Sequence, residues 1–216
     1  MKGIISIVLT CAIVLIGGSA MAQTASLKRA SISFERMAYE DAANYYEKAV
    51  KQGANELEVA RNLAISYRKL RDFKNAERWY AKMILARNAK PEDLYNFSEV
   101  LRSNGKYAES EFWLEEYKEL VEGDSRIARQ QNVLAYLENI WFEPLKNCRI
   151  KNIASNSEYA DMGPTLLGNK LYFASARTNK FAVERTHSWN DKPFLDLYVA
   201  DTSLYGEIET PIEFSG

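Results

Sequence analysis

Two hydrophobic patterns divide the chain. In residues 23–142, small residues recur at Ala42, Ala76 and Ser110, with 34 residues between neighbours. Two helices that cross closely need a small residue at the contact and a large one to fill the adjacent groove. The surrounding residues repeat accordingly, with an aromatic residue before each small one and large or apolar residues after it: Tyr39, Phe73 and Tyr107, then Tyr46, Tyr80 and Leu114, then Ala49, Met83 and Tyr117. The pattern therefore predicts helical hairpins stacked in series.

The first helix of each predicted hairpin follows the same rule. Ala30, Ala64 and Ser98 occupy the position of close approach and again lie 34 residues apart. A further amphipathic segment, SRIARQQNVLAYLENIWF at 125–142, is expected to cap the stack, because an array of hairpins otherwise ends on a bare apolar face. Glu143-Pro144 then ends the helical part.

The chain after residue 143 alternates in a way that is typical of half-buried strands. KLYFAS at 170–175 and DLYVAD at 196–201 mix large apolar residues with small or polar ones. We interpret NSEYADMGPTLLGNKLYFASAR as two short strands and a turn, with turn chemistry at Gly163-Pro164 and Gly168-Asn169. Residues 147–156 are a candidate for an additional outer strand. The hydrophobic pattern thus predicts an α + β chain in two segments.

The first residues, MKGIISIVLTCAIVLIGGSAMAQ, have the features of a secretory signal. They contain one lysine, an apolar run from Ile4 to Ile16, and small residues at Ala20 and Ala22. We predict export with cleavage after Ala22 and no membrane-spanning segment in the mature chain; an uncleaved anchor is the alternative. Cys11 lies inside the apolar run, which argues against a lipoprotein. The predicted domains are a signal peptide at 1–22, a helical domain at 23–142 and a β domain at 143–216.

The charge balance narrows the choice of partners. The chain has 28 Lys and Arg against 29 Asp and Glu, a formal net charge of −1, and no basic block. This balance argues against nucleic acid or an anionic membrane surface as the principal partner. The mature chain would keep only Cys148, so we expect no internal disulfide. We also expect no metal and no cofactor.

The 34-residue spacing resembles that of the tetratricopeptide repeat family over Gln23 to Asp124, in three repeats without gaps. The first repeat departs from the family pattern because Arg29 and Ser33 replace large residues, as suits a terminal repeat. The resemblance implies an α-solenoid in which the first helix of each repeat lines a concave groove that binds an extended protein segment. A solvated helix face is an equal alternative. The candidate binding residues are Arg61, Asn62, Arg68, Lys69, Asn96, Glu99 and Arg102.

The β segment resembles one blade of a WD40-like propeller of the TolB type. The resemblance rests on Pro164 and Gly168, on a Phe-x-Ser-x-Arg run that begins at Phe173, and on an Asp-apolar-Tyr strand that begins at Asp196. A propeller closes with four or more blades. We therefore expect this segment to be the first blade of an incomplete propeller whose remainder is absent through truncation or a gene fragment.

Repeats followed by such a blade look very like the front of the OmpA family proteins associated with type IX secretion and gliding. In that family a propeller, a β-sandwich and a peptidoglycan-binding OmpA-like domain follow the repeats and anchor outer-membrane machinery to the cell wall. The resemblance implies a non-catalytic periplasmic scaffold, associated with the outer membrane, that docks outer-membrane or secretion-system proteins through its groove. Peptidoglycan binding would belong to a domain absent from this chain, so no residue is assigned to it.

Two other function classes stay open. A stand-alone peptide-binding periplasmic adaptor would use the groove without a wall anchor; an open reading frame continuing past the codon for Gly216 would favour the anchor instead. A propeller-based hydrolase is less favoured, because the only histidine, His187, lies in a polar loop at 177–193 without a metal-spaced cluster or a nucleophile elbow. The nearby carboxylates are more typical of turns and blade bracing than of catalysis: Asp161, Glu184, Asp191 and Asp196.

Overall fold

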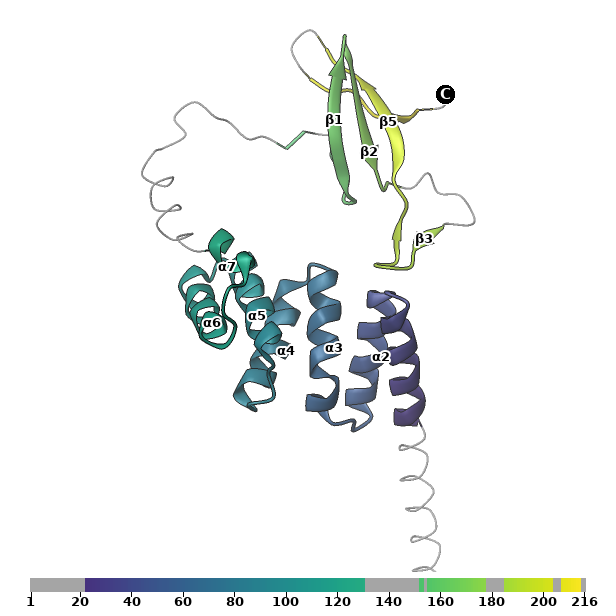
Figure 1. The fold of residues 1–216 in the computed structure, drawn as a ribbon. Coiled ribbons are helices and arrows are strands. Elements are labelled where there is room, and N and C mark those ends of the chain that lie inside the picture. Colours follow the sequence, from purple (N-terminus) through teal and green to yellow (C-terminus); the bar gives the residue numbers. More distant parts are fainter. Residues whose placement is uncertain (1–21, 131–151, 154, 178–184, 204–206, 215–216) are drawn as a thin grey trace, which may run out of the picture. The chain divides into compact units, whose positions relative to one another are not determined.

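The computed structural model describes residues 22–130, 152–153, 155–177, 185–203 and 207–214. The chain divides into two compact units, Met1–Pro144 and Leu145–Gly216. The described part of the first is helical, and that of the second is a small antiparallel sheet, so the protein is α + β as predicted (Figure 1). Residues 1–21 of the predicted signal peptide, the predicted boundary after residue 142, Cys148 and Glu184 lie outside the described residues.

The helices of the first unit pack one after another (Figure 1). Residues 22–35 are helical. The helices that follow are α2 (Tyr39–Lys51), α3 (Glu56–Lys69), α4 (Phe73–Leu85), α5 (Pro91–Ser103), α6 (Tyr107–Leu120) and α7 (Ser125–Gln130). From α2 to α6 each helix contacts the next. The predicted capping segment starts with α7, and its residues 131–142 lie outside the described part.

Local chemistry sets the ends of these helices. At the start of α4 the Asp72 side chain accepts a hydrogen bond from the Asn75 backbone N–H at 3.2 Å, which satisfies an amide that a helix start leaves open. The turns before α2, α4 and α6 contain Met37, Arg71 and Gly105, whose φ angles are 60°, 61° and 78°. These positions are again 34 residues apart. The sequence repeat therefore extends to the backbone conformation of the turns.

The recurring small residues lie in the core of the helical unit. Ala42 and Ala76 have no exposed surface, and Ser110 is 5% exposed. The Ser110 hydroxyl donates a hydrogen bond to the Ser98 carbonyl at 2.7 Å, so two positions of predicted close approach touch across α5 and α6. The large residues that follow each small one are also buried: Tyr46, Tyr80 and Leu114. The predicted packing register thus agrees with the burial, while the assignment to a repeat family stays a prediction.

The second unit contains a four-stranded antiparallel sheet with the order β1-β2-β5-β6 (Figure 1). Its strands are β1 (Asp161–Leu167), β2 (Lys170–Ser175), β5 (Asp196–Asp201) and β6 (Ile212–Glu213). A separate hairpin pairs β3 (Thr186–His187) with β4 (Lys192–Pro193). The predicted strands KLYFAS and DLYVAD are β2 and β5, and Gly168-Asn169 forms the predicted turn between β1 and β2.

Two expectations for the β segment were wrong. Gly163-Pro164 do not form a turn between strands but lie inside β1, where the register with β2 shifts. Gly163 supplies a φ of 63°, and Pro164, which has no N–H to donate, is tolerated because β1 is an edge strand. The polar segment around His187 was expected to be a loop, but it includes the β3–β4 hairpin.

Arg177 braces one end of the sheet. Its guanidinium donates to Asp161 Oδ1 at 2.9 Å through Nη2 and to Ser175 Oγ at 2.8 Å through Nε. The same group lies over the rings of Phe173 and Tyr198, 5.1 and 5.2 Å from their centroids. Because the guanidinium bonds to β1 and β2 and covers a ring of β5, it ties three strands together.

Candidate functional site

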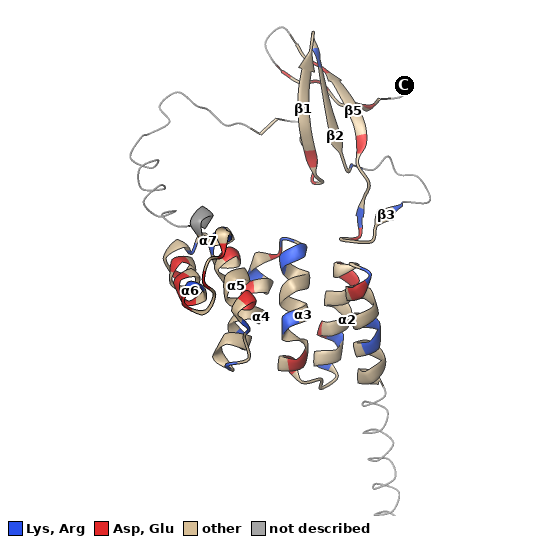
Figure 2. Ribbon diagram, viewed as in Figure 1, with Lys and Arg blue, Asp and Glu red and all other residues tan. Residues whose placement is uncertain are grey.

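The seven residues predicted to bind a partner all lie on α3 and α5, and we call them the candidate face: Arg61, Asn62, Arg68, Lys69, Asn96, Glu99 and Arg102. Positive and negative side chains are interspersed on these helices (Figure 2). Lys69 is exposed and Asn96 is 7% exposed, whereas the others are half-buried. The sequence prediction therefore selected one region of the helical unit, but its members differ in what they contact.

Arg61 is engaged inside the protein. Its Nε lies 3.2 and 3.0 Å from the two carboxylate oxygens of Asp93, and its Nη2 donates to the Asn88 carbonyl at 2.9 Å. The Asp93 side chain is only 5% exposed and also accepts from the Lys90 backbone N–H at 2.8 Å, where α5 begins. This network joins α3 to the start of α5. Arg61 is thus placed to hold helices together, whatever else it binds.

Asn62, Glu99 and Arg102 also have partners. The Asn62 amide donates to the Tyr46 hydroxyl at 2.7 Å, which connects α3 to α2. Glu99 and Arg102 form an ion pair one helical turn apart on α5. Such pairs on a partly exposed helix contribute at most a few tenths of a kcal/mol. These residues keep some exposed surface, so a ligand could still reach them.

Arg68 differs from the other arginines of the candidate face. Its Nε is buried and has no hydrogen-bond partner in the described part of the chain, and the same is true of the hydroxyl of Tyr80 on α4. Burial raises the pKa of Tyr80 to about 12, and the positive charge of Arg68 offsets part of the rise, so the two groups are neighbours. Tyr80 therefore keeps its proton at neutral pH. Arg68 and Tyr80 are two adjacent donors without an acceptor.

Charge accounting singles out the same place. Arg61 faces Asp93, and Arg102 faces Glu99. No ion pair among the described residues includes Arg68. One turn after Asp93 on α5, the largely buried amide of Asn96 supplies a further N–H donor on the candidate face. The arrangement can accept a carboxylate or a carbonyl oxygen from a bound molecule.

Sequence reasoning missed the role open to Tyr80. The 34-residue pattern assigned Tyr80 to core packing, and its ring is indeed buried and lies 6.2 Å from the Phe97 ring. A tyrosine at a core position brings a hydroxyl that must find a partner, and this is the signal that the pattern contains. Whether that partner exists depends on the residues of neighbouring helices.

The residues that an enzyme would need have structural contacts. The Nδ1 atom of exposed His187 accepts a hydrogen bond from the Trp189 backbone N–H at 3.0 Å. Asp161 is bonded to Arg177, Asp191 accepts from the Thr186 hydroxyl at 2.8 Å, and Asp196 pairs with β2 as the first residue of β5. Within the described ranges, no group of three or more His, Cys, Asp or Glu residues is arranged to hold a metal.

Comparison of the chain with protein-family models and with curated proteins gives no match. In the described residues, no helix is both long enough and apolar enough to cross a membrane. What the chain does must therefore be inferred from its own residues.

Proposed function

We propose that this protein is a non-catalytic periplasmic scaffold that docks an outer-membrane or secretion-system protein on the candidate face. In this proposal the helical unit is a solenoid of three tetratricopeptide repeats, and the sheet is the first blade of a WD40-like propeller that offers a second interaction surface. The chain is related to the OmpA family proteins of type IX secretion and gliding. A signal peptide cleaved after Ala22 exports it.

The single observation that carries the proposal is the unsatisfied pair of Arg68 and Tyr80. A buried donor that is left without an acceptor costs about 1 to 3 kcal/mol of stability. A bound segment that offers a carboxylate or a backbone carbonyl would accept from both groups and remove that cost. Docking of an extended segment with acidic or carbonyl groups is therefore the function that this face supports best.

The repeat and blade assignments have support of their own. The 34-residue period recurs in buried residues and in the turn positions Met37, Arg71 and Gly105. The sheet exposes apolar side chains on both faces, since Leu197 is 45% exposed on one face and Leu166 is 64% exposed on the other. A sheet with two apolar faces is typical of one flanked by other sheets on both sides, as a propeller blade is.

The test separates binding from stability. We predict that Arg68→Met weakens recovery of a partner from solubilised cell envelope by about tenfold, because one charge-assisted hydrogen bond is worth about 1.5 to 3 kcal/mol. The same substitution should leave the free energy of unfolding unchanged or raise it, because it removes a partly buried cation without a counter-charge. Tyr80→Phe should behave in the same direction with a smaller loss of partner.

Two control variants complete the experiment. Arg87→Met removes an exposed arginine after α4, outside the candidate face, and should change neither property. Arg61→Met should lower stability by about 2 kcal/mol or more, because it leaves Asp93 buried without its partner. Equal partner recovery with the parent and with Arg68→Met would exclude the candidate face. Loss of the partner only after deletion of residues 145–216 would move the docking site to the sheet unit.

A further inference from the structure

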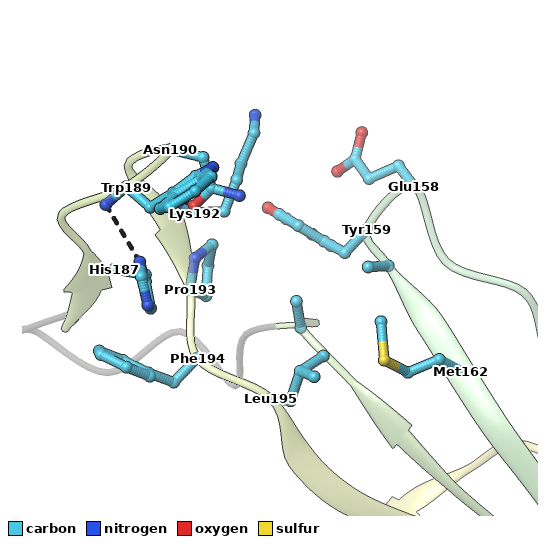
Figure 3. Close-up of a pocket in the computed structure, with 12 residues that line it drawn as sticks. Glu158, Tyr159, Met162, His187, Trp189, Asn190, Lys192, Pro193, Phe194 and Leu195 are labelled. Atoms are coloured by element: carbon cyan, nitrogen blue, oxygen red, sulfur yellow. Dashed lines mark hydrogen bonds between the residues drawn. The ribbon is translucent and has the colours of Figure 1, made fainter. Parts of the chain in front are cut away.

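A cavity of about 820 Å³ lies in the sheet unit, between the β3–β4 hairpin and the segment that leads into β1 (Figure 3). Small-molecule sites in proteins range from about 300 to 1,000 Å³ and combine mostly apolar walls with a few polar groups. This cavity has that composition. It lies in a different unit from the candidate face, so it is independent of the docking function proposed above.

Aromatic rings form the walls of the cavity. Tyr159, on the segment before β1, points towards Trp189 on the hairpin (Figure 3). Phe194 stands on a further side, 53% exposed, with the His187 ring 5.5 Å from its centroid. Met162 is 50% exposed and lines the same space. The rings therefore present flat surfaces to a ligand instead of packing against one another.

The hairpin that carries Trp189 is held by its own contacts. His187 Nδ1 accepts from the Trp189 backbone N–H at 3.0 Å, and the Thr186 hydroxyl donates to Asp191 Oδ1 at 2.8 Å across the turn. Asp191 adopts a positive φ of 50°, which closes the turn between β3 and β4. The aromatic walls are thus fixed before any ligand binds.

The charges of the cavity limit which ligand it can take. Glu158 and Lys192 both line it, and neither takes part in an ion pair among the described residues. A carboxylate only accepts hydrogen bonds and an ammonium only donates them. An anionic ligand would be opposed by Glu158 and a cationic one by Lys192, while a purely apolar ligand would leave both charges unpaired. The ligand that satisfies both is neutral and carries groups that donate and accept, as hydroxyl groups do.

We propose that this cavity binds a neutral saccharide. A pyranose ring with equatorial hydroxyls has an apolar C–H face and a polar rim. The face stacks on the ring of Trp189 or Tyr159, and the rim hydroxyls donate to the Glu158 carboxylate and accept from the Lys192 ammonium. An apolar peptide side chain would use the same rings but would leave the two charges unused.

The test titrates the full chain with cellotriose, a neutral trisaccharide of this shape, and with N-acetyltryptophanamide as the apolar peptide probe. Isothermal titration calorimetry should detect cellotriose binding. Trp189→Ala should weaken it by about tenfold or more, and Trp189→Phe should recover part of the affinity because a ring is restored. Glu158→Ala and Lys192→Ala should each weaken it by about threefold to tenfold.

Phe112→Ala is the matched control, because Phe112 is an aromatic residue of α6 that is 56% exposed and belongs to the other unit. It should leave cellotriose binding unchanged. Absence of cellotriose binding to the parent at millimolar concentration, or equal binding by the parent and the Glu158 and Lys192 variants, would overturn the proposal. Tighter binding of N-acetyltryptophanamide than of cellotriose would assign the cavity to a peptide instead.

Discussion

At the residue scale, the turns inside the helical hairpins show where a side chain opposes the backbone. Arg71 is exposed and holds a φ of 61°, a conformation that costs an L-residue about 1 to 2 kcal/mol, whereas Gly105 occupies the equivalent position at no such cost. We predict that Arg71→Gly raises the free energy of unfolding by up to about 1 kcal/mol, because the relief of strain exceeds the added entropy of glycine in the unfolded chain. Urea unfolding followed by far-UV circular dichroism measures this. Arg71→Ala removes the same side chain but keeps Cβ, so it should bring no gain; an equal gain in both variants would attribute the effect to charge instead of φ.

At the element scale, α4 packs against both of its neighbours through a surface that includes a small residue. Ala76 has no exposed surface, and a larger side chain there would push α4 away from its neighbours. We predict that Ala76→Leu lowers the free energy of unfolding by about 1 to 3 kcal/mol, as overpacking does in other cores. Ala108→Leu adds the same atoms to an exposed position of α6 and should change stability by less than about 0.5 kcal/mol. Thermal unfolding of the two variants and the parent decides the matter, and identical melting of all three would show that the packing register is wrong.

At the scale of the whole molecule, the two compact units should respond separately to pH. Burial alone would raise the pKa of Asp161, but hydrogen bonds from Ser175, Ser157 and Arg177 outweigh it and hold the pKa well below its ordinary value of 3.8. Because the folded-state pKa is lowered, Asp161 stabilises the sheet unit above the unfolded pKa, and this contribution is lost as the pH falls from about 5 to 2. We predict that Asp161→Asn destabilises the sheet unit at neutral pH and flattens its loss of stability in acid. Sheet and helix resonances followed by NMR during acid titration measure both units at once. An equal effect of the substitution on the helical unit would contradict the separation of the two.

The sequence by itself determined the periodic features of this protein. The spacing of Ala42, Ala76 and Ser110 predicted which helix positions are buried, and the alternation in KLYFAS and DLYVAD predicted β2 and β5. Such features are accessible because a helix or a strand repeats its own geometry over a few residues. Local chemistry also predicted the turn at Gly168-Asn169, although the same reasoning misplaced Gly163-Pro164, because a glycine with positive φ also fits a shifted register inside an edge strand.

Only the tertiary structure decided which polar side chains are already paired. Arg61 and Arg68 were equivalent candidates in the sequence, yet Arg61 meets Asp93 from another helix whereas Arg68 lies beside the hydroxyl of Tyr80 without an acceptor. The cavity walled by Tyr159 and Trp189 likewise joins residues that are well separated in sequence. A long side chain finds its partner through the packing of whole elements, and no local period encodes which residues that packing brings within the reach of a hydrogen bond.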